Sequence, residues 1–203
     1  MHQSTYVYHA VSSEAFEEKF GGFLTDMSWV NFGGGHHITR EGYGLDLFVK
    51  LIHDFKSRHD ITVYIEPGEA VALNAGYLVS TVLDIVKNGA EIAILDTSAA
   101  CHMPDVIEMP YTPPVFGAKT NGDHAYRLAG PTCLAGDIIG DYRFDTPLSP
   151  DSRVVFGDMA IYSMVKNNTF NGIGLPDIAV LRQDGRFDVL RSFGFDDFRC
   201  RLS

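Results

Sequence analysis

The stretch Trp29–Arg40 reads WVNFGGGHHITR, an apolar run that ends in three consecutive glycines. An apolar run bounded by glycine predicts a short buried strand followed by a loop. The segment Leu45–His59 follows with apolar residues at helical spacing, and Thr62–Ile65 is a second apolar run, stopped by Pro67. Strand, loop, helix and strand in this order are typical of a parallel α/β layer.

One more helix is expected before this stretch, from Ser13 to Leu24, with Ser12 or Ser13 as its N-cap. Only about two strand–helix units are then present, whereas a complete (β/α)8 barrel needs ~250 residues. We therefore expect residues 1–70 to form the C-terminal segment of a barrel and not a whole barrel.

Beyond residue 70 the pattern changes to closely spaced β-like runs. Tyr77–Val86 and Glu91–Leu95 flank the turn signal Asn88-Gly89. Later runs, separated by turns rich in Gly, Pro, Asn and Asp, are Arg153–Phe156, Ala160–Val165, Ile178–Arg182 and Phe187–Ser192. This spacing predicts a mainly antiparallel β domain over residues 71–203, either a sandwich or a barrel.

Composition excludes several classes of function. The 203 residues carry a formal net charge of -10, which argues against a nucleic-acid partner and is compatible with a small cationic substrate. No apolar run reaches the ~18 residues of a membrane span, and no signal-peptide pattern opens the chain. Cys101, Cys133 and Cys200 are an odd, widely spaced set and a poor disulfide framework, so we expect a reducing cytoplasm.

Gly33, Gly34 and Gly35 are the first candidate binding residues. Backbone N–H groups in a glycine-rich loop approach an anion closely, which suits a phosphate. A tight turn is the alternative. His36 and His37 follow directly, but adjacent side chains on an extended backbone point in different directions, so we expect no shared metal.

Three further residues are candidates, each with a structural alternative. Glu66 follows the second strand, where α/β proteins place ligand contacts; an exposed turn carboxylate is the alternative. Cys133 lies in a loop bracketed by glycines, where a thiol is accessible and reactive, although most single cysteines are buried and inert. Tyr162 lies in an apolar run, where a tyrosine alone usually indicates packing.

Five motifs occur in a specific order along residues 29–175: VNFGGGHHITR, YIEPGEAVALNAG, ILDTSAACHMPDVIEMPY, GPTCLAGDIIGDY and MVKNNTFNGI. Together they resemble the second half of the fold-type III (alanine-racemase-like) pyridoxal-phosphate-dependent decarboxylases, and within them the carboxynorspermidine decarboxylase branch. The resemblance implies pyridoxal 5'-phosphate at the mouth of a (β/α)8 barrel, followed by a β domain. It also implies decarboxylation of carboxynorspermidine or carboxyspermidine, which are cationic carboxylated polyamines, to norspermidine or spermidine in polyamine biosynthesis.

The resemblance also assigns roles to individual residues. The three glycines match the phosphate-binding loop, and Glu66 matches the acid that pairs with the pyridine nitrogen. Cys133 matches a cysteine that is supplied across a homodimer interface and helps to protonate the product. Tyr162 matches a tyrosine near the cofactor phosphate.

Two departures from the family pattern bear on function. Many relatives have a phosphate-binding arginine where Glu69 stands; Glu69 would instead attract an ammonium group of the substrate. Asp105 matches a region that reaches the distal substrate amine, and for both acids a solvated surface carboxylate is the alternative. The lysine that holds the cofactor lies early in the family barrel, and none of the six lysines here stands in its context.

The chain is therefore expected to act as part of a complete enzyme, as a homodimer or with a partner chain that completes the barrel, and to be inactive alone. One alternative is another basic amino-acid decarboxylase of the same fold. A second is a non-catalytic polyamine-binding or regulatory fragment.

Overall fold

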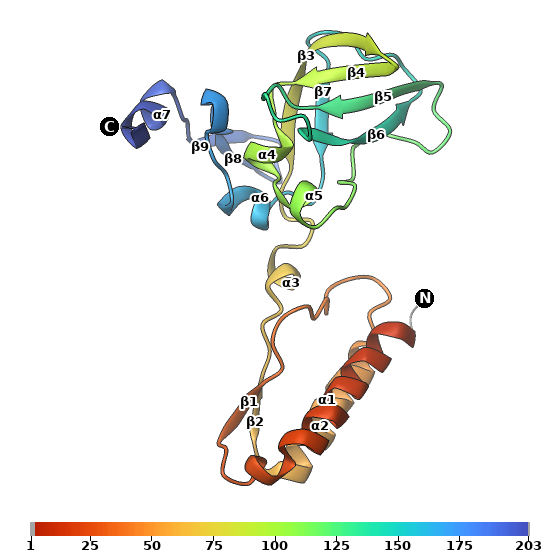
Figure 1. Cartoon of the computed structure of the whole chain (residues 1–203), viewed down its shortest axis with the longest axis vertical. Helices are drawn as coiled ribbons and strands as arrows, with labels where there is room; N and C mark the ends of the chain where they lie inside the picture. The colour runs from red at the N-terminus through yellow and green to blue at the C-terminus, as the bar shows by residue number, and fades with distance from the viewer. Residues whose placement is uncertain (1–2, 203) are drawn as a thin grey trace. The chain divides into compact units, whose positions relative to one another are not determined.

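The structure is a computed structural model that describes residues 3–202, with side chains described from Ser13 onward (Figure 1). It divides into two compact units between Leu73 and Asn74. Each unit is built around its own hydrophobic cluster.

The first unit contains two parallel strands and three helices: α1 (Gln3–Leu24), β1 (Trp29–Asn31), α2 (Leu45–His59), β2 (Thr62–Tyr64) and α3 (Gly68–Ala72). β1 pairs in parallel with β2, with Val30 opposite Val63. The predicted order of strand, loop, helix and strand is thereby confirmed. Its core joins α1, β1 and α2 through Leu24, Val30 and Phe55, with Phe32 edge-to-face on Phe55 at 5.0 Å between ring centroids.

The expected start of the first helix is wrong. α1 begins at Gln3, so Ser12 and Ser13 lie inside the helix and neither is its N-cap. Serine in a helix interior costs only a few tenths of a kcal/mol relative to alanine. Packing of α1 against α2 through Phe16 and Leu24 outweighs that cost, because tertiary contacts and not propensity stabilise most helices.

The second unit is built on a five-stranded mixed sheet. Its strands are β3 (Leu78–Asn88), β4 (Ala90–Leu95), β5 (His124–Ala129), β6 (Ile138–Phe144) and β7 (Arg153–Phe156), in the order β6-β5-β4-β3-β7. Neighbours are antiparallel except β4 and β5, which are parallel. The expectation of a mainly antiparallel domain is therefore met only in part, because this parallel pair needs a crossover connection.

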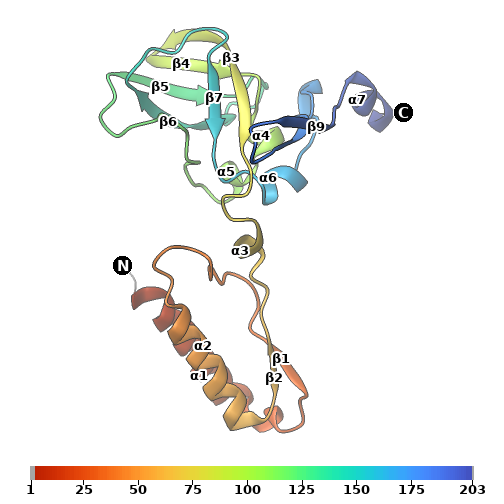
Figure 2. The same ribbon diagram turned by 180° about the vertical axis from the view of Figure 1, so that it is seen from behind.

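That crossover contains two short helices, α4 (Ala99–His102) and α5 (Asp105–Glu108). It continues through isolated bridges from Val115 to Phe156 of β7 and from Ala118 to Phe144 of β6. The segment thus contacts both edge strands of the sheet, which is curled (Figures 1 and 2).

The rest of the second unit contains α6 (Tyr162–Val165), the 3-10 turn η1 (Phe170–Gly172), the antiparallel hairpin of β8 (Ile178–Leu181) and β9 (Phe187–Arg191), and α7 (Phe195–Leu202). The predicted strand at 160–165 is wrong, because Tyr162–Val165 forms one helical turn. Asn167 closes that turn: its side-chain amide donates to the backbone oxygens of Ser163 at 2.7 Å and Met164 at 3.0 Å. Asparagine side chains often compete with strand pairing in this way.

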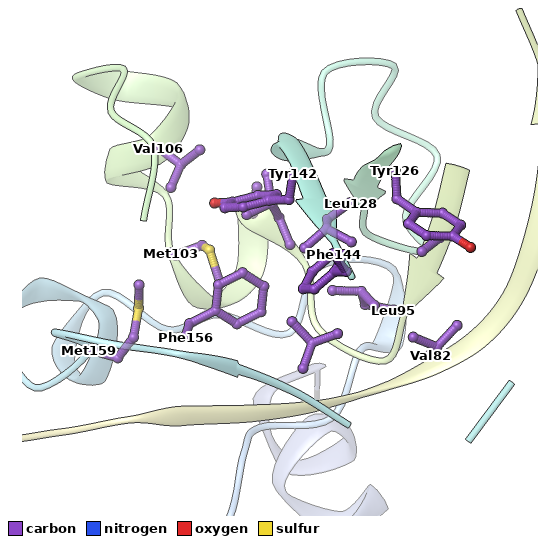
Figure 3. Packing of buried hydrophobic residues seen from close by; sticks show 14 residues of the cluster. Val82, Leu95, Met103, Val106, Tyr126, Leu128, Tyr142, Phe144, Phe156 and Met159 are labelled. Carbon is purple, nitrogen blue, oxygen red and sulfur yellow. The ribbon is translucent and has the colours of Figure 1, made fainter. Parts of the chain in front are cut away.

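The core of the second unit fixes the place of α4 and α5. Leu95, Leu128 and Phe156 are fully buried, and Met103 and Val106 pack into the same cluster from the helical crossover (Figure 3). Each such apolar side chain contributes about 1.5–3 kcal/mol on burial. The crossover is therefore anchored by packing, and the loops that it contacts gain a rigid support.

Candidate functional site

The three glycines form a tight loop directly after β1. Gly33 and Gly35 have φ of +74° and +79°, a region that glycine enters without strain. A side chain on Gly34 would begin 3.3 Å from the backbone oxygen of Glu66. Without side chains, the glycines leave the backbone of this loop open to close approach by an anion, and the phosphate contact stays a prediction.

Glu66 is exposed just beyond the end of β2 and is bonded to this loop. Its backbone N–H donates to Gly33 O at 2.8 Å, and its Oε1 accepts from Asn31 Nδ2 at 2.6 Å. Asn31 Oδ1 in turn accepts from the Gly33 N–H at 2.8 Å. One asparagine therefore connects the glycine loop to the carboxylate that is expected to meet the pyridine nitrogen.

Sequence reasoning missed Asn31. The available signal was a polar residue inside an apolar strand. In β1 only Val30 is buried, so Trp29 and Asn31 lie together on the opposite, exposed face.

Glu69 lies in the first turn of α3 and already contacts two basic side chains. Its Oε1 contacts Arg40 Nε, and its Oε2 lies 2.9 Å from His37 Nδ1. Thr39 adds a hydrogen bond to Ala70 O at 3.2 Å. Glu69 thus holds the loop after the glycines, and its contact with a substrate ammonium stays a prediction.

Asp105 lies at the start of α5 and also has a cationic partner. Its Oδ1 is 2.5 Å from Lys166 Nζ, and Lys166 also contacts Glu108. These two carboxylate contacts raise the pKa of Lys166. The same ammonium lies 5.6 Å from the ring centroid of Tyr162, so the fold brings Asp105 and Tyr162 to one cation.

Cys133 is exposed, unlike the buried Cys101, whose thiol pKa is raised by burial. The backbone N–H of Cys133 donates to Asn171 Oδ1 at 3.0 Å. Its loop is also bonded to the buried carboxylate of Asp137. The thiol is therefore accessible on a loop that is held in place, and its role in protonation stays a prediction.

The sequence-predicted residues fall into two sets, each placed within its own unit. The first unit holds Gly33, Gly34, Gly35, Glu66 and Glu69, and the second holds Asp105, Cys133 and Tyr162. His36 is a core residue: its ring packs on Phe48 at 4.7 Å between centroids, and burial lowers its pKa. Within residues 3–202 no group of three or more His, Cys, Asp or Glu side chains is placed to hold a metal ion.

A parallel strand–helix segment with a glycine loop and an exposed carboxylate, followed by a curled mixed sheet, is the architecture of the C-terminal half of a fold-type III decarboxylase. The family profile described as "Pyridoxal-dependent decarboxylase, C-terminal sheet domain" matches residues 5–160. The chain belongs to this family, and the resemblance found in the motifs is confirmed.

Individual relatives support the same family assignment. The chain is 44% identical over 201 residues to the carboxynorspermidine/carboxyspermidine decarboxylase of Campylobacter jejuni, covering 93% of this chain and 53% of that protein. It is 46% identical over 190 residues to the carboxyaminopropylagmatine decarboxylase of Synechocystis, covering 92% and 49%. The crystal structure of the Campylobacter jejuni carboxynorspermidine decarboxylase with norspermidine superposes with a TM-score of 0.87 at 42% identity, covering 97% of this chain and 57% of that one.

The chain thus spans about half the length of the curated relatives that it matches. Among the helices of residues 3–202, none has the length and apolar character required to cross a membrane.

Proposed function

We propose that this chain supplies the C-terminal part of a pyridoxal-phosphate-dependent carboxy-lyase that converts carboxynorspermidine or carboxyspermidine to norspermidine or spermidine. The observation that carries the proposal is 44% identity, over 93% of the chain, to an enzyme named for these two substrates. The bonded set of Asn31, the glycine loop and Glu66 supports it, because that set fits the phosphate and the ring nitrogen of the cofactor.

When bound, pyridoxal phosphate supplies the electron sink for the electron pair that remains as CO2 departs. The glycine loop would hold the phosphate through the backbone N–H groups that remain free of Asn31, and the family resemblance assigns Tyr162 as a further phosphate contact. The Glu66 carboxylate would keep a proton on the ring nitrogen, which would keep that sink strong. Cys133 delivers the proton that completes the amine product.

The substrate-binding part of the proposal assigns cationic groups of the polyamine to Glu69 and Asp105. Asp105 and Glu108 already bind one lysine ammonium, so their spacing suits an ammonium of the same chemistry. A substrate ammonium near Glu69 shares the carboxylate with Arg40 and His37.

A second candidate substrate is carboxyaminopropylagmatine, because the relative of that name is 46% identical to the chain. The agmatine part ends in a planar guanidinium and not in an ammonium, and the two cations need different carboxylate geometry. Comparing kcat/KM for the two substrates decides between them. The same assay would reveal a basic amino-acid decarboxylase by its preference for a shorter substrate, and a regulatory fragment by polyamine binding without turnover.

The proposed enzyme is a cytoplasmic homodimer, or a complex with a partner chain that completes the barrel. Three free cysteines support a reducing compartment. Exposed apolar residues of the barrel segment, among them Trp29 and Tyr64, support association, because a barrel buries such residues inside.

The proposal is tested by assaying CO2 release from carboxynorspermidine with the chain alone, and then with the chain mixed with a polypeptide that carries the remaining barrel units and the cofactor lysine. We expect no release from the chain alone and release from the mixture. Activity of the chain alone would overturn the need for a second segment. A folded, cofactor-loaded mixture that decarboxylates neither polyamine substrate would overturn the function.

A further inference from the structure

One buried carboxylate fastens the loop that carries Cys133. Asp137 is 3% exposed, and its two oxygens accept four hydrogen bonds. Oδ1 accepts from Ser98 Oγ at 3.0 Å and from Ala100 N at 3.3 Å. Oδ2 accepts from Thr132 Oγ1 at 2.7 Å and from Thr132 N at 3.2 Å. Asp137 therefore ties the residue before Cys133 to the N-terminal turn of α4.

Gly130 closes the same loop against this carboxylate. Its N–H donates to the backbone oxygen of Asp137 at 2.8 Å. A side chain at position 130 would begin 2.2 Å from Asp137 Oδ2, so only glycine fits there. The loop is thus closed by backbone and side-chain bonds to one residue, and its conformation depends on that residue.

A second loop, from later in the sequence, also reaches Cys133. Asn171 lies in η1 with φ of 57°, a left-handed conformation that asparagine tolerates better than most residues. Its Oδ1 accepts the backbone N–H of Cys133 at 3.0 Å. Gly172 continues the turn with φ of +76°.

The loop of Asn171 is held by the same helix that Asp137 contacts. His102 Nε2 lies 3.0 Å from Gly174 O, and Asn168 Nδ2 donates to Ala100 O at 2.8 Å. Helix α4 itself is packed in the core. The 130–137 loop and the 168–174 loop therefore share one rigid support, and they are joined at the Cys133–Asn171 hydrogen bond.

We propose that Asn171 and Asp137 are positioning residues that fix the Cys133 thiol for protonation of the correct carbon; the inference rests on the role proposed above for Cys133. An exposed side chain has no packing around it, so its direction depends on its backbone. Productive proton transfer needs placement to within about half an ångström. The bond that the Cys133 N–H donates to Asn171 and the bonds that Thr132 donates to Asp137 together hold that backbone.

Two substitutions at position 171 separate the hydrogen bond from the backbone conformation. Asn171→Gly keeps the left-handed conformation and removes the acceptor. Asn171→Asp keeps both, since aspartate also tolerates this region and presents an oxygen. We expect the Cys133 amide hydrogen of the whole chain to exchange with solvent about tenfold faster in the glycine variant, as for loss of one ordinary hydrogen bond, and at the wild-type rate in the aspartate variant.

Asp137→Asn tests the other side of the loop. The asparagine presents an NH2 group where the wild type presents an oxygen, so the amide opposes two donors, either those of Thr132 or those of Ser98 and Ala100. We expect faster exchange at Cys133 here as well. Asp141→Asn on β6 is the matched control, because it makes the same chemical change at a carboxylate whose side chain is 67% exposed.

Activity supplies the readout that a merely structural role would not change. In the complete enzyme, protonation at the substrate carbon gives the amine product. Protonation at the cofactor carbon, followed by hydrolysis of the carbon–nitrogen bond by water, would give an aldehyde and leave the amino group on the cofactor. We expect Asn171→Gly to raise the aldehyde fraction of the product severalfold and Asn171→Asp to restore the amine.

The outcomes separate this inference from the proposed function. An increased aldehyde fraction in Cys133→Ala but not in Asn171→Gly or Asp137→Asn overturns the positioning role alone. Clean amine product from Cys133→Ala overturns the proton-donor role on which the inference rests. Unchanged amide exchange at Cys133 in Asn171→Gly shows that the bond does not hold the loop, whatever the function is.

Discussion

Replacing Glu66 by glutamine isolates the charge expected to meet the pyridine nitrogen. Glutamine is almost the same size, and its Oε1 still accepts the 2.6 Å bond from Asn31. Asn31 can then still accept from Gly33, so the phosphate loop keeps its shape. What is lost is the negative charge and the strong bond to a protonated ring nitrogen.

The magnitude follows from the kinds of hydrogen bond involved. A bond to a charged group contributes about 1.5–3 kcal/mol and a neutral bond about 0.5–1.5 kcal/mol. The difference of about 1–1.5 kcal/mol corresponds to roughly fivefold to tenfold weaker cofactor binding. Asn31→Ala removes two bonds at once, the one that Asn31 donates to Glu66 and the one that it accepts from Gly33, and we expect cofactor binding to weaken by about 1–3 kcal/mol.

Cofactor binding can be measured with a fluorescent residue that the chain itself contains. It contains a single tryptophan, Trp29, exposed on the same face of β1 as Asn31. Titrating the chain with pyridoxal phosphate and following Trp29 fluorescence gives the affinity without any turnover. Glu91→Gln, at an exposed position of β4, is the control for a general effect of charge.

Equal affinity of the wild type and Glu66→Gln would refute the assignment of Glu66 to the ring nitrogen. The reasoning about Asn31 is tested separately by the double variant. Because Asn31 and Glu66 share a bond, their effects on affinity should not add. Strict additivity would show that Asn31 does not act through Glu66.

Three further predictions concern substrate, product and acid stability. Glu69→Gln and Asp105→Asn, in a complete enzyme, should each raise KM for carboxynorspermidine about tenfold to a hundredfold through loss of a charge-assisted contact; unchanged KM in both removes these residues from the site. Cys133→Ala should keep cofactor affinity and decarboxylate slowly or give a misprotonated product, and wild-type turnover with clean product would make Cys133 inert. Burial lowers the pKa of His102 below its ordinary 6.5, so the unfolded chain binds the proton first as the pH falls. The His102 contribution to the free energy of unfolding should therefore be constant above pH 6.5. Below pH 6.5 it should decrease by at most about 1.4 kcal/mol per pH unit. Denaturant unfolding of His102→Gln across this range should show a smaller decrease of the free energy of unfolding with falling pH.

Local signals in the sequence predicted the elements that local signals determine. The turn Asn88-Gly89 joins β3 to β4 as expected, with Gly89 at φ of +71°. The helical stripe at 45–59 is α2 with unchanged bounds. In both cases the periodicity or the turn chemistry acts within a few residues, so no knowledge of the rest of the fold is needed.

The elements that were missed depend on distant partners. β5 (HAYRLA) carries Arg127, which forms an ion pair with Asp141 of β6 at 2.8 Å, and its mixed composition hides the strand from a search for apolar alternation. Its parallel pairing with β4 spans the whole helical crossover. The error at 160–165 has a local cause instead: the run is apolar enough for a strand, yet bonds from the nearby Asn167 side chain close it into a helical turn.

The distinction between local signals and distant partners also applies to the site. It explains which site residues could not be predicted from the sequence. Glu66 and Cys133 were predicted from motifs, whereas their supports, Asn31 and Asn171, were not. The supporting bonds join residues 35 and 38 positions apart, so no local pattern contains both partners. Exposed functional side chains lack packing, and their support must come from polar side chains that bond to backbone or carboxylate. An asparagine inside an apolar strand or just before a turn glycine is therefore the residue to examine beside each predicted functional group, because its amide can both donate and accept.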